Sequence, residues 1–245
     1  MEIGLIVIGD EILSGRRRDG HLGAVVERLH ARGLTLDWCR IVGDDVERLT
    51  RTLRETLATE ALVFSCGGIG ATPDDVTRAA AAAATGRPLV RHPEGEALLR
   101  ARFGDDASDL RLRMVEFPEG AGLIPNPVNQ VPGFQLNAHY FVPGFPSMAW
   151  PMIEWVLDTH YAEHASTPPV TRSIRVIARE SDLIPLLERL GDEHPDVRFS
   201  SLPDMSGDDY VVELGIVGPP AAVDAAQGGL DEALTHAGVV RERNH

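Results

Sequence analysis

The chain has 245 residues, of which 43% are hydrophobic and 5% aromatic, and it carries a formal net charge of −14 at pH 7. This length allows one large domain or two modest ones, each with its own buried core. The negative charge argues against binding to nucleic acid or to an anionic membrane, because both need a basic surface. All 23 residues of the Lys and Arg count are arginine, which excludes mechanisms that depend on a lysine, such as a P-loop or a Schiff base.

Two features indicate the compartment. The two cysteines, Cys39 and Cys66, form neither a CxxC pair nor a disulfide framework, which favours reducing surroundings. The first residues lead directly into an apolar run without the layout of a signal peptide, and no apolar run reaches the roughly 20 residues of a membrane helix. We therefore expect a cytoplasmic protein that does not enter a membrane.

Residues 1–160 alternate between strand-like and helix-like segments. Apolar runs predict strands at residues 3–8, 34–42, 61–65 and 139–142. Apolar residues at helical spacing predict helices at residues 22–30, 46–57, 76–85 and 93–103, and a last one after the turn at Pro146. This alternation predicts βαβ units, with a mainly parallel sheet and helices on both of its faces.

The pattern changes after Thr167-Pro168-Pro169, which is typical of a linker. The segments beyond it predict a strand, a helix, two strands and a helix, at residues 173–178, 183–193, 197–201, 210–217 and 221–237. We therefore expect two domains: an α/β domain over residues 1–166 and a small α+β domain of βαββα order over residues 170–245. We expect the small domain to serve packing, dimerisation or the shaping of a site entrance.

The most informative segment is residues 65–77, SCGGIGATPDDVT, between a predicted strand and a predicted helix. Its glycines allow a close approach of the backbone to a ligand, and free N–H groups at a helix start favour anions. The alternative is simple capping, with Thr72 as N-cap, Pro73 at the first helical position and Asp75 three residues after the cap. Capping explains neither the three glycines nor the second carboxylate, Asp74, so the pattern favours a site for a phosphate and a metal ion.

Three further turns follow predicted strands. Residues 9–15, GDEILSG, could hold a hydrated Mg²⁺ through their carboxylates, or form a plain loop with Asp19 capping the next helix. Gly43-Asp44-Asp45 favours capping, and residues 143–147, PGFPS, fit helix initiation and phosphate contact equally well. Ligands of such folds bind beyond the carboxyl ends of parallel strands, and all four turns lie there.

The run GGIGATPDDVT resembles the GGxGxTxxDxT signature of the molybdopterin-binding domain superfamily. It is most similar to the branch of competence/damage-inducible protein A, where the motif typically reads GGLGPTxDDxT. The other strand-end turns fall in the order expected of that branch over about residues 1–160, and the tail resembles its small second domain by element order alone. The resemblance implies a three-layer α/β/α sandwich that binds a molybdopterin or an adenine nucleotide phosphate, and a homo-oligomer.

The resemblance also implies roles for particular residues. Asp75 takes the position associated with adenylyl transfer, whereas Asp74 stands where the adenylyltransferases have arginine. Asp74 matches the competence-protein branch instead, whose members include metal-dependent pyrophosphatases of ADP-ribose-like or flavin dinucleotides. The chain departs from that branch at His21 in place of asparagine and at Asp10 in place of threonine, and the usual asparagine-rich segment is missing around residues 109–114.

The resulting hypothesis is a nucleotide pyrophosphatase that uses a divalent metal, with magnesium the expected ion. The catalytic candidates are Asp75, Asp74 and Glu11, and the metal candidates are Asp74, Asp75, Asp10 and Asp44. The candidates for phosphate or nucleotide binding are Gly9, Gly67, Gly68, Gly70, Thr72, Pro143, Gly144 and Ser147. The alternatives are a molybdopterin-binding protein of molybdenum cofactor biosynthesis, with or without adenylyl transfer, and a binding module without catalysis.

Overall fold

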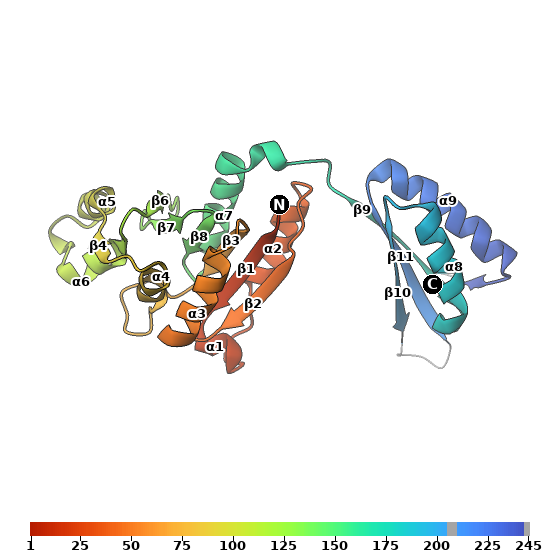
Figure 1. Cartoon of the computed structure of the whole chain (residues 1–245), viewed down its shortest axis with the longest axis horizontal. Coiled ribbons are helices and arrows are strands. Elements are labelled where there is room, and N and C mark those ends of the chain that lie inside the picture. Colours follow the sequence, from red (N-terminus) through yellow and green to blue (C-terminus); the bar gives the residue numbers. More distant parts are fainter. Residues whose placement is uncertain (205–209, 243–245) are drawn as a thin grey trace. The chain divides into compact units, whose positions relative to one another are not determined.

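The computed structural model describes residues 1–204 and 210–242. The chain divides into two compact units, residues 1–165 and residues 166–245 (Figure 1). None of the helices in the described part is long and apolar enough to cross a membrane.

The first unit is built on a six-stranded sheet with the strand order β2-β1-β3-β8-β7-β6. Its strands are β1 (Ile3–Ile8), β2 (Trp38–Val42), β3 (Leu62–Cys66), β6 (Gly122–Ile124), β7 (Gly133–Leu136) and β8 (His139–Val142). The first three strands and β8 run parallel to one another, whereas β7 and β6 continue the sheet antiparallel to β8. The register pairs Ile8 with Val42 and Cys66 with Val142, so the carboxyl ends of the parallel strands meet at one edge.

Helices cover both faces of this sheet, as predicted (Figure 1). On one face lie α3 (Val46–Leu57), α4 (Thr77–Thr85) and α5 (Pro93–Phe103), and on the other α2 (His21–His30) and α7 (Pro146–His160). Alternate side chains of β1 point to the two faces: Ile6 packs in the core under α3 and α4, and Leu5 in the core under α2 and α7. The predicted three-layer α/β/α sandwich is confirmed.

Shorter elements complete the unit. They are α1 (Asp10–Leu13), α6 (Asp109–Leu112), the 3₁₀ turns η1 (Gly104–Asp106), η2 (Arg113–Val115) and η3 (Ala162–His164), and a two-stranded sheet of β4 (Leu89–Arg91) with β5 (Glu116–Pro118). The prediction of a strand from residue 34 is wrong, because β2 begins at Trp38. Just before it, Asp37 binds the Ile3 N–H through its carboxylate, at 2.7 Å, and donates its own N–H to the Ile3 oxygen, at 2.8 Å.

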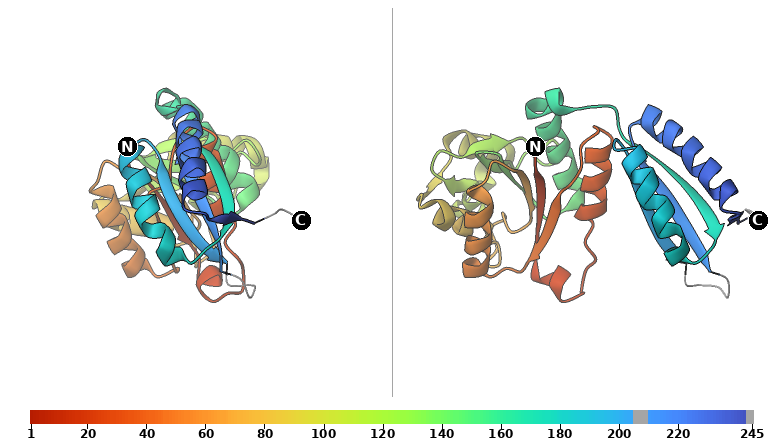
Figure 2. Two further views of the ribbon diagram at one scale, coloured as in Figure 1. Left: turned by 90° about the vertical axis from the view of Figure 1, so that its right-hand side faces the viewer. Right: turned by 45° about the vertical axis from the view of Figure 1, so that its right-hand side comes forward.

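The second unit has a four-stranded antiparallel sheet with the order β10-β11-β9-β12. Its elements are β9 (Val170–Ile177), α8 (Glu180–Glu193), β10 (Arg198–Asp204), β11 (Val211–Gly218), α9 (Pro220–His236) and β12 (Val240–Arg241). Both helices pack against the sheet through one core that includes Leu190, Leu214 and Leu230 (Figure 2). The predicted small α+β fold is confirmed, and the short strand β12 is an addition to it.

Candidate functional site

The turns after β1, β2, β3 and β8 surround one cavity of about 450 Å³. Backbone hydrogen bonds hold the turns together: the Gly9 N–H donates to the Val42 oxygen, and the Gly67 N–H donates to the Val142 oxygen, both at 3.0 Å. The cavity is lined by Ile8, Gly9, Glu11, Arg17, Asp44, Gly67, Gly68, Ile69, Gly70, Ala71, Thr72, Asp74, Asp75, Met114, Asn129, Val131, Pro132, Pro143, Gly144, Phe145 and Met148. Eleven of the predicted site residues are therefore brought to one place.

The glycine loop, residues 67–70, has a backbone that requires glycine at particular positions. Gly67 and Gly68 have φ angles of +120° and +66°, which side chains rarely tolerate. A Cβ on Gly67 would lie 2.3 Å from the Ile8 oxygen, and a Cβ on Gly70 would lie 2.4 Å from the Asp75 carboxylate. The glycines thus allow the loop to cross directly over the end of β1.

The carbonyl groups of this loop are tied back towards α4. The Thr77 hydroxyl donates to the Gly67 oxygen at 2.9 Å, the Thr77 N–H donates to the Gly68 oxygen at 3.0 Å, and Arg78 donates to the Gly70 oxygen at 2.7 Å. In contrast, no acceptor within residues 1–204 and 210–242 takes the N–H groups of residues 68–71. A run of free N–H groups beside a cavity is an arrangement that binds anions.

Arg78 connects the glycine loop to a more distant segment. Its side chain is buried and also donates to the carbonyl oxygens of Arg113 and Glu116. Burial lowers the pKa of Arg78, while the neighbouring carboxylates of Glu116 and Asp75 oppose that shift. The guanidinium therefore joins the loop to the segment that places Met114 in the cavity wall.

The predicted capping role of Thr72 and Pro73 is wrong, because α4 begins at Thr77 with Val76 in the N-cap position. Residues 72–76 form turns instead, in which the Asp75 N–H donates to the Thr72 oxygen at 3.0 Å. The Asp75 carboxylate accepts hydrogen bonds from both the N–H and the hydroxyl of Thr72. These turns place Thr77 directly under the glycine loop, where its hydroxyl and N–H bind the loop carbonyls.

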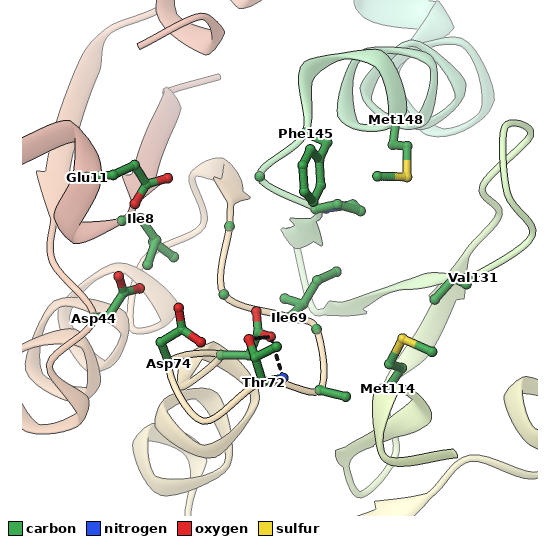
Figure 3. Close-up of a pocket in the computed structure, with 18 of the residues that line it drawn as sticks. Ile8, Glu11, Asp44, Ile69, Thr72, Asp74, Met114, Val131, Phe145 and Met148 are labelled. Atoms are coloured by element: carbon green, nitrogen blue, oxygen red, sulfur yellow. Dashed lines mark hydrogen bonds between the residues drawn. The ribbon is translucent and has the colours of Figure 1, made fainter. Parts of the chain in front are cut away.

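Three carboxylates, those of Glu11, Asp44 and Asp74, gather on one side of the cavity (Figure 3). The pKa of Asp44 is raised, first by partial burial and then by the charges of Asp10, Glu11 and Asp74. The pKa of Asp74 lies below its usual value because the Thr72 hydroxyl and the Asp74 N–H are beside its carboxylate. This side of the cavity therefore concentrates negative charge.

Asp10 and Ser147 do not line the cavity. Asp10 instead joins two turns reciprocally with Asp44: the Asp10 N–H donates to Asp44 at 2.9 Å, and the Asp44 N–H donates to Asp10 at 3.2 Å. Ser147 is exposed in the first turn of α7. The predicted capping at the second turn is made by Asp45, which accepts the Arg48 N–H at 2.7 Å.

Within the part of the chain that the structure describes, no three side chains of His, Cys, Asp or Glu are arranged to hold a metal ion by themselves. The carboxylates of Glu11, Asp44 and Asp74 nevertheless form a set of hard oxygen donors beside free backbone N–H groups. Mg²⁺ is usually held by one or two carboxylates together with substrate phosphates. The donor set fits that manner of binding.

Several lining residues were missed from the sequence. They are Ile8, Arg17, Ile69, Ala71, Met114, Asn129, Val131, Pro132, Phe145 and Met148. Arg17 belongs to a run of three arginines just after the first acidic turn, a signal that was available. Met114 and residues 129–132 come from irregular segments, where no periodic pattern indicates a direction. His21 lies outside the lining, buried, with its Nε2 3.1 Å from the Gly144 oxygen.

Comparison with known proteins adds three relatives. A protein of Pyrobaculum calidifontis is 27% identical over 242 residues, covering 94% of this chain and 92% of the relative. A CinA-like protein of Geobacter metallireducens is 35% identical over 200 residues, covering 75% of this chain and 48% of the relative. The solved structure of the protein CinA from Thermoplasma acidophilum, described as of unknown function, is 26% identical with a TM-score of 0.58, covering 64% of this chain and 98% of that one.

Two family profiles match the two units. Residues 4–162 match a profile described as "Probable molybdopterin binding domain", and residues 168–243 match one described as "FAD synthase, middle domain". The chain spans almost the whole of the Pyrobaculum relative but only about half of the CinA-like relative of Geobacter.

Proposed function

The chain belongs to the molybdopterin-binding domain family through residues 4–162, and from that premise we propose that its cavity binds a nucleotide or pterin phosphate and hydrolyses a dinucleotide pyrophosphate with a divalent metal. The predicted resemblance to the family and to its competence/damage-inducible protein A branch is confirmed by the profile and the CinA-like relatives. ADP-ribose-like and flavin dinucleotides are the proposed substrates, and a homo-oligomer is the proposed assembly.

One observation carries the proposal. The free N–H groups of residues 68–71 and the carboxylates of Glu11, Asp44 and Asp74 line the same cavity. Backbone donors suit a phosphate, whereas a carboxylate group repels one unless a cation lies between them. A site that has both is suited to a diphosphate together with a divalent metal ion.

Asp74 and Asp44 are the residues that would hold the metal, with Glu11 beside them. When bound, the metal neutralises charge on the diphosphate and on the phosphate that leaves. Asp74 suits the role of a charged ligand, because its lowered pKa favours the carboxylate form. Asp44 is already fixed in orientation by its hydrogen bond from the Asp10 N–H.

The remaining steps belong to the chain's own groups. The N–H groups of residues 68–71 stabilise negative charge that develops on the phosphoryl oxygens. Arg17 lines the cavity and offers a guanidinium to a phosphate. Water attacks one phosphorus atom, the bridging P–O bond breaks, and Glu11 accepts the proton from the water, so that two monophosphates result.

The test is incubation with ADP-ribose and Mg²⁺, Mn²⁺ or Co²⁺, which should release AMP. FAD is the second substrate to test, supported by the match of residues 168–243 to the middle domain of FAD synthase. Asp74→Asn should lower kcat roughly 100-fold or more. The matched control is Asp105→Asn, which changes an exposed carboxylate of η1 outside the cavity.

Turnover that survives Asp74→Asn, or that needs no metal, would overturn the assignment.

The second candidate function is binding of a molybdopterin without hydrolysis. The family description and the apolar side of the cavity, with Phe145 and Met148, favour it. Copurification of a fluorescent pterin, together with no AMP release under any of the three metals, would decide for this alternative. Light scattering of the purified chain tests the proposed homo-oligomer.

A further inference from the structure

The cavity has a second wall of different character. Phe145, Met148, Met114 and Val131 lie across the glycine loop from the carboxylates, and Ile69 of the loop lies between the two sides (Figure 3). Phe145 is 58% exposed although it lines the cavity, so a large part of its surface is open to a ligand. Met114 comes from a segment more than 30 residues before Phe145 and Met148, and the two segments converge only in the folded unit.

The one amide side chain of this wall already makes two hydrogen bonds, which hold it in orientation. The Asn129 Nδ2 donates to the Met148 sulfur at 2.9 Å, and the Asn129 Oδ1 accepts the Val131 N–H at 2.9 Å. The neighbouring Pro132 has no N–H to offer. The wall therefore presents an aromatic ring, two thioethers and aliphatic carbon, and a single amide that uses one N–H and one oxygen lone pair to hold Met148 and Val131 in place.

We propose that Phe145, Met114, Met148 and Val131 form a subsite for a flat heteroaromatic ring joined to the bound phosphate, and that this subsite holds the ring by its faces without reading its edge. The proposal rests on the phosphate-binding role of the glycine loop. Stacking on an aromatic side chain contributes about 1–3 kcal/mol and tolerates any base, because every base has a π-face. Thioethers add favourable contacts to aromatic rings.

The consequence is a characteristic selectivity. A site that hydrogen-bonds the edge of its ligand rejects analogues by about 10⁴–10⁵-fold, whereas an apolar pocket discriminates by only about 10–200-fold. Because its other side chains are apolar and its one amide is held by two bonds within the wall, this wall belongs to the second class. Purine, flavin and pterin phosphates should therefore bind with similar affinity, and specificity should come from the phosphate end of the cavity.

The experiment measures binding by calorimetry with Mg²⁺, so that it does not depend on catalysis. The probes are AMP, GMP, FMN, a pterin monophosphate and ribose 5-phosphate. The ring-bearing probes should have Kd values within about 10-fold of one another, and ribose 5-phosphate should bind about 5- to 150-fold more weakly, which corresponds to the stacking contribution.

Phe145→Leu should weaken AMP and FMN binding towards that of ribose 5-phosphate while leaving ribose 5-phosphate itself unchanged, which also shows that the variant is folded. Phe145→Trp should preserve the preference for ring-bearing probes. The control is Leu110→Ala, an equally exposed apolar residue of α6 outside the cavity, and it should change nothing.

Discrimination between AMP and GMP above 100-fold would overturn the proposal, as would an equal loss of AMP and ribose 5-phosphate binding in Phe145→Leu. Ring-dependent binding without any AMP release from ADP-ribose would leave the subsite intact and remove the pyrophosphatase assignment. Failure of every probe to bind would overturn both.

Discussion

Replacing Thr77 with valine tests whether the glycine loop is held from below. Thr77 is fully buried, and its hydroxyl donates to the Gly67 oxygen at 2.9 Å. Valine has nearly the same shape, so Thr77→Val removes the donor without opening a cavity. The Thr77 N–H keeps its hydrogen bond to the Gly68 oxygen, which confines the change to one carbonyl group.

The expected cost follows from leaving the Gly67 carbonyl without this donor. A polar group deprived of its partner in the interior costs about 1–3 kcal/mol. For a unit of 165 residues, each kcal/mol lowers Tm by about 2–4 °C. Thr77→Val should therefore lower the Tm by about 2–12 °C in calorimetric unfolding, and it should weaken AMP binding because the loop N–H groups lose their orientation.

Thr85→Val is the matched control, since the Thr85 hydroxyl in the same helix donates to the Ala81 oxygen at 2.9 Å. A helix carbonyl four residues back already accepts a backbone N–H, so the Ala81 oxygen keeps a partner when the Thr85 hydroxyl is removed. The loss in free energy of unfolding for Thr85→Val should therefore stay below about 0.5 kcal/mol. Thr77→Ser keeps the hydroxyl and should preserve AMP binding. Equal Tm losses in Thr77→Val and Thr85→Val would refute the idea that this hydroxyl anchors the loop.

Two further predictions concern His139 and Arg17. Burial lowers the pKa of His139 to about 3 from 6.5. Below pH 6.5 the unfolded chain therefore binds a proton at His139, whereas the folded chain leaves it neutral. The free energy of unfolding should fall by roughly 2 kcal/mol between pH 7 and pH 5. The His139 Nε2 lies 2.7 Å from the Ser65 Oγ, and both side chains are buried. The double variant Ser65→Ala, His139→Phe removes both groups and should flatten the dependence of the unfolding free energy on pH between 7 and 5. An unchanged slope would contradict this. Arg17→Leu should weaken AMP binding about 10-fold through loss of a charged phosphate contact. Arg18→Leu, outside the cavity, should not, and equal effects of the two would indicate a general loss of positive charge.

The continuous apolar segments were predicted well. The predicted bounds of β1, β8 and α5 agree with the structure, because strands buried on both faces and a helix opened by a proline have strong local signals. The start of β2 and the capping of α4 by Thr72 were wrong. Asp37 pairs with Ile3 before β2 begins, and Thr72 pairs with Asp75 in a turn before α4, so hydrogen bonds to particular partners decided both boundaries.

The sequence alone was enough to predict that four glycine-bearing turns, three of them with aspartates, follow parallel strands and therefore meet at one edge of a sheet. Which group each aspartate binds became known only from the folded chain. Asp10 and Asp44 bind each other's backbone across 34 residues, and Asp75 closes a turn, which leaves Asp74 exposed at the cavity. The apolar wall with Phe145 could not be predicted from the sequence either, because its side chains come from segments that are far apart along the chain. Local patterns report which face of an element is buried, whereas a site depends on partners that only the folded chain brings together.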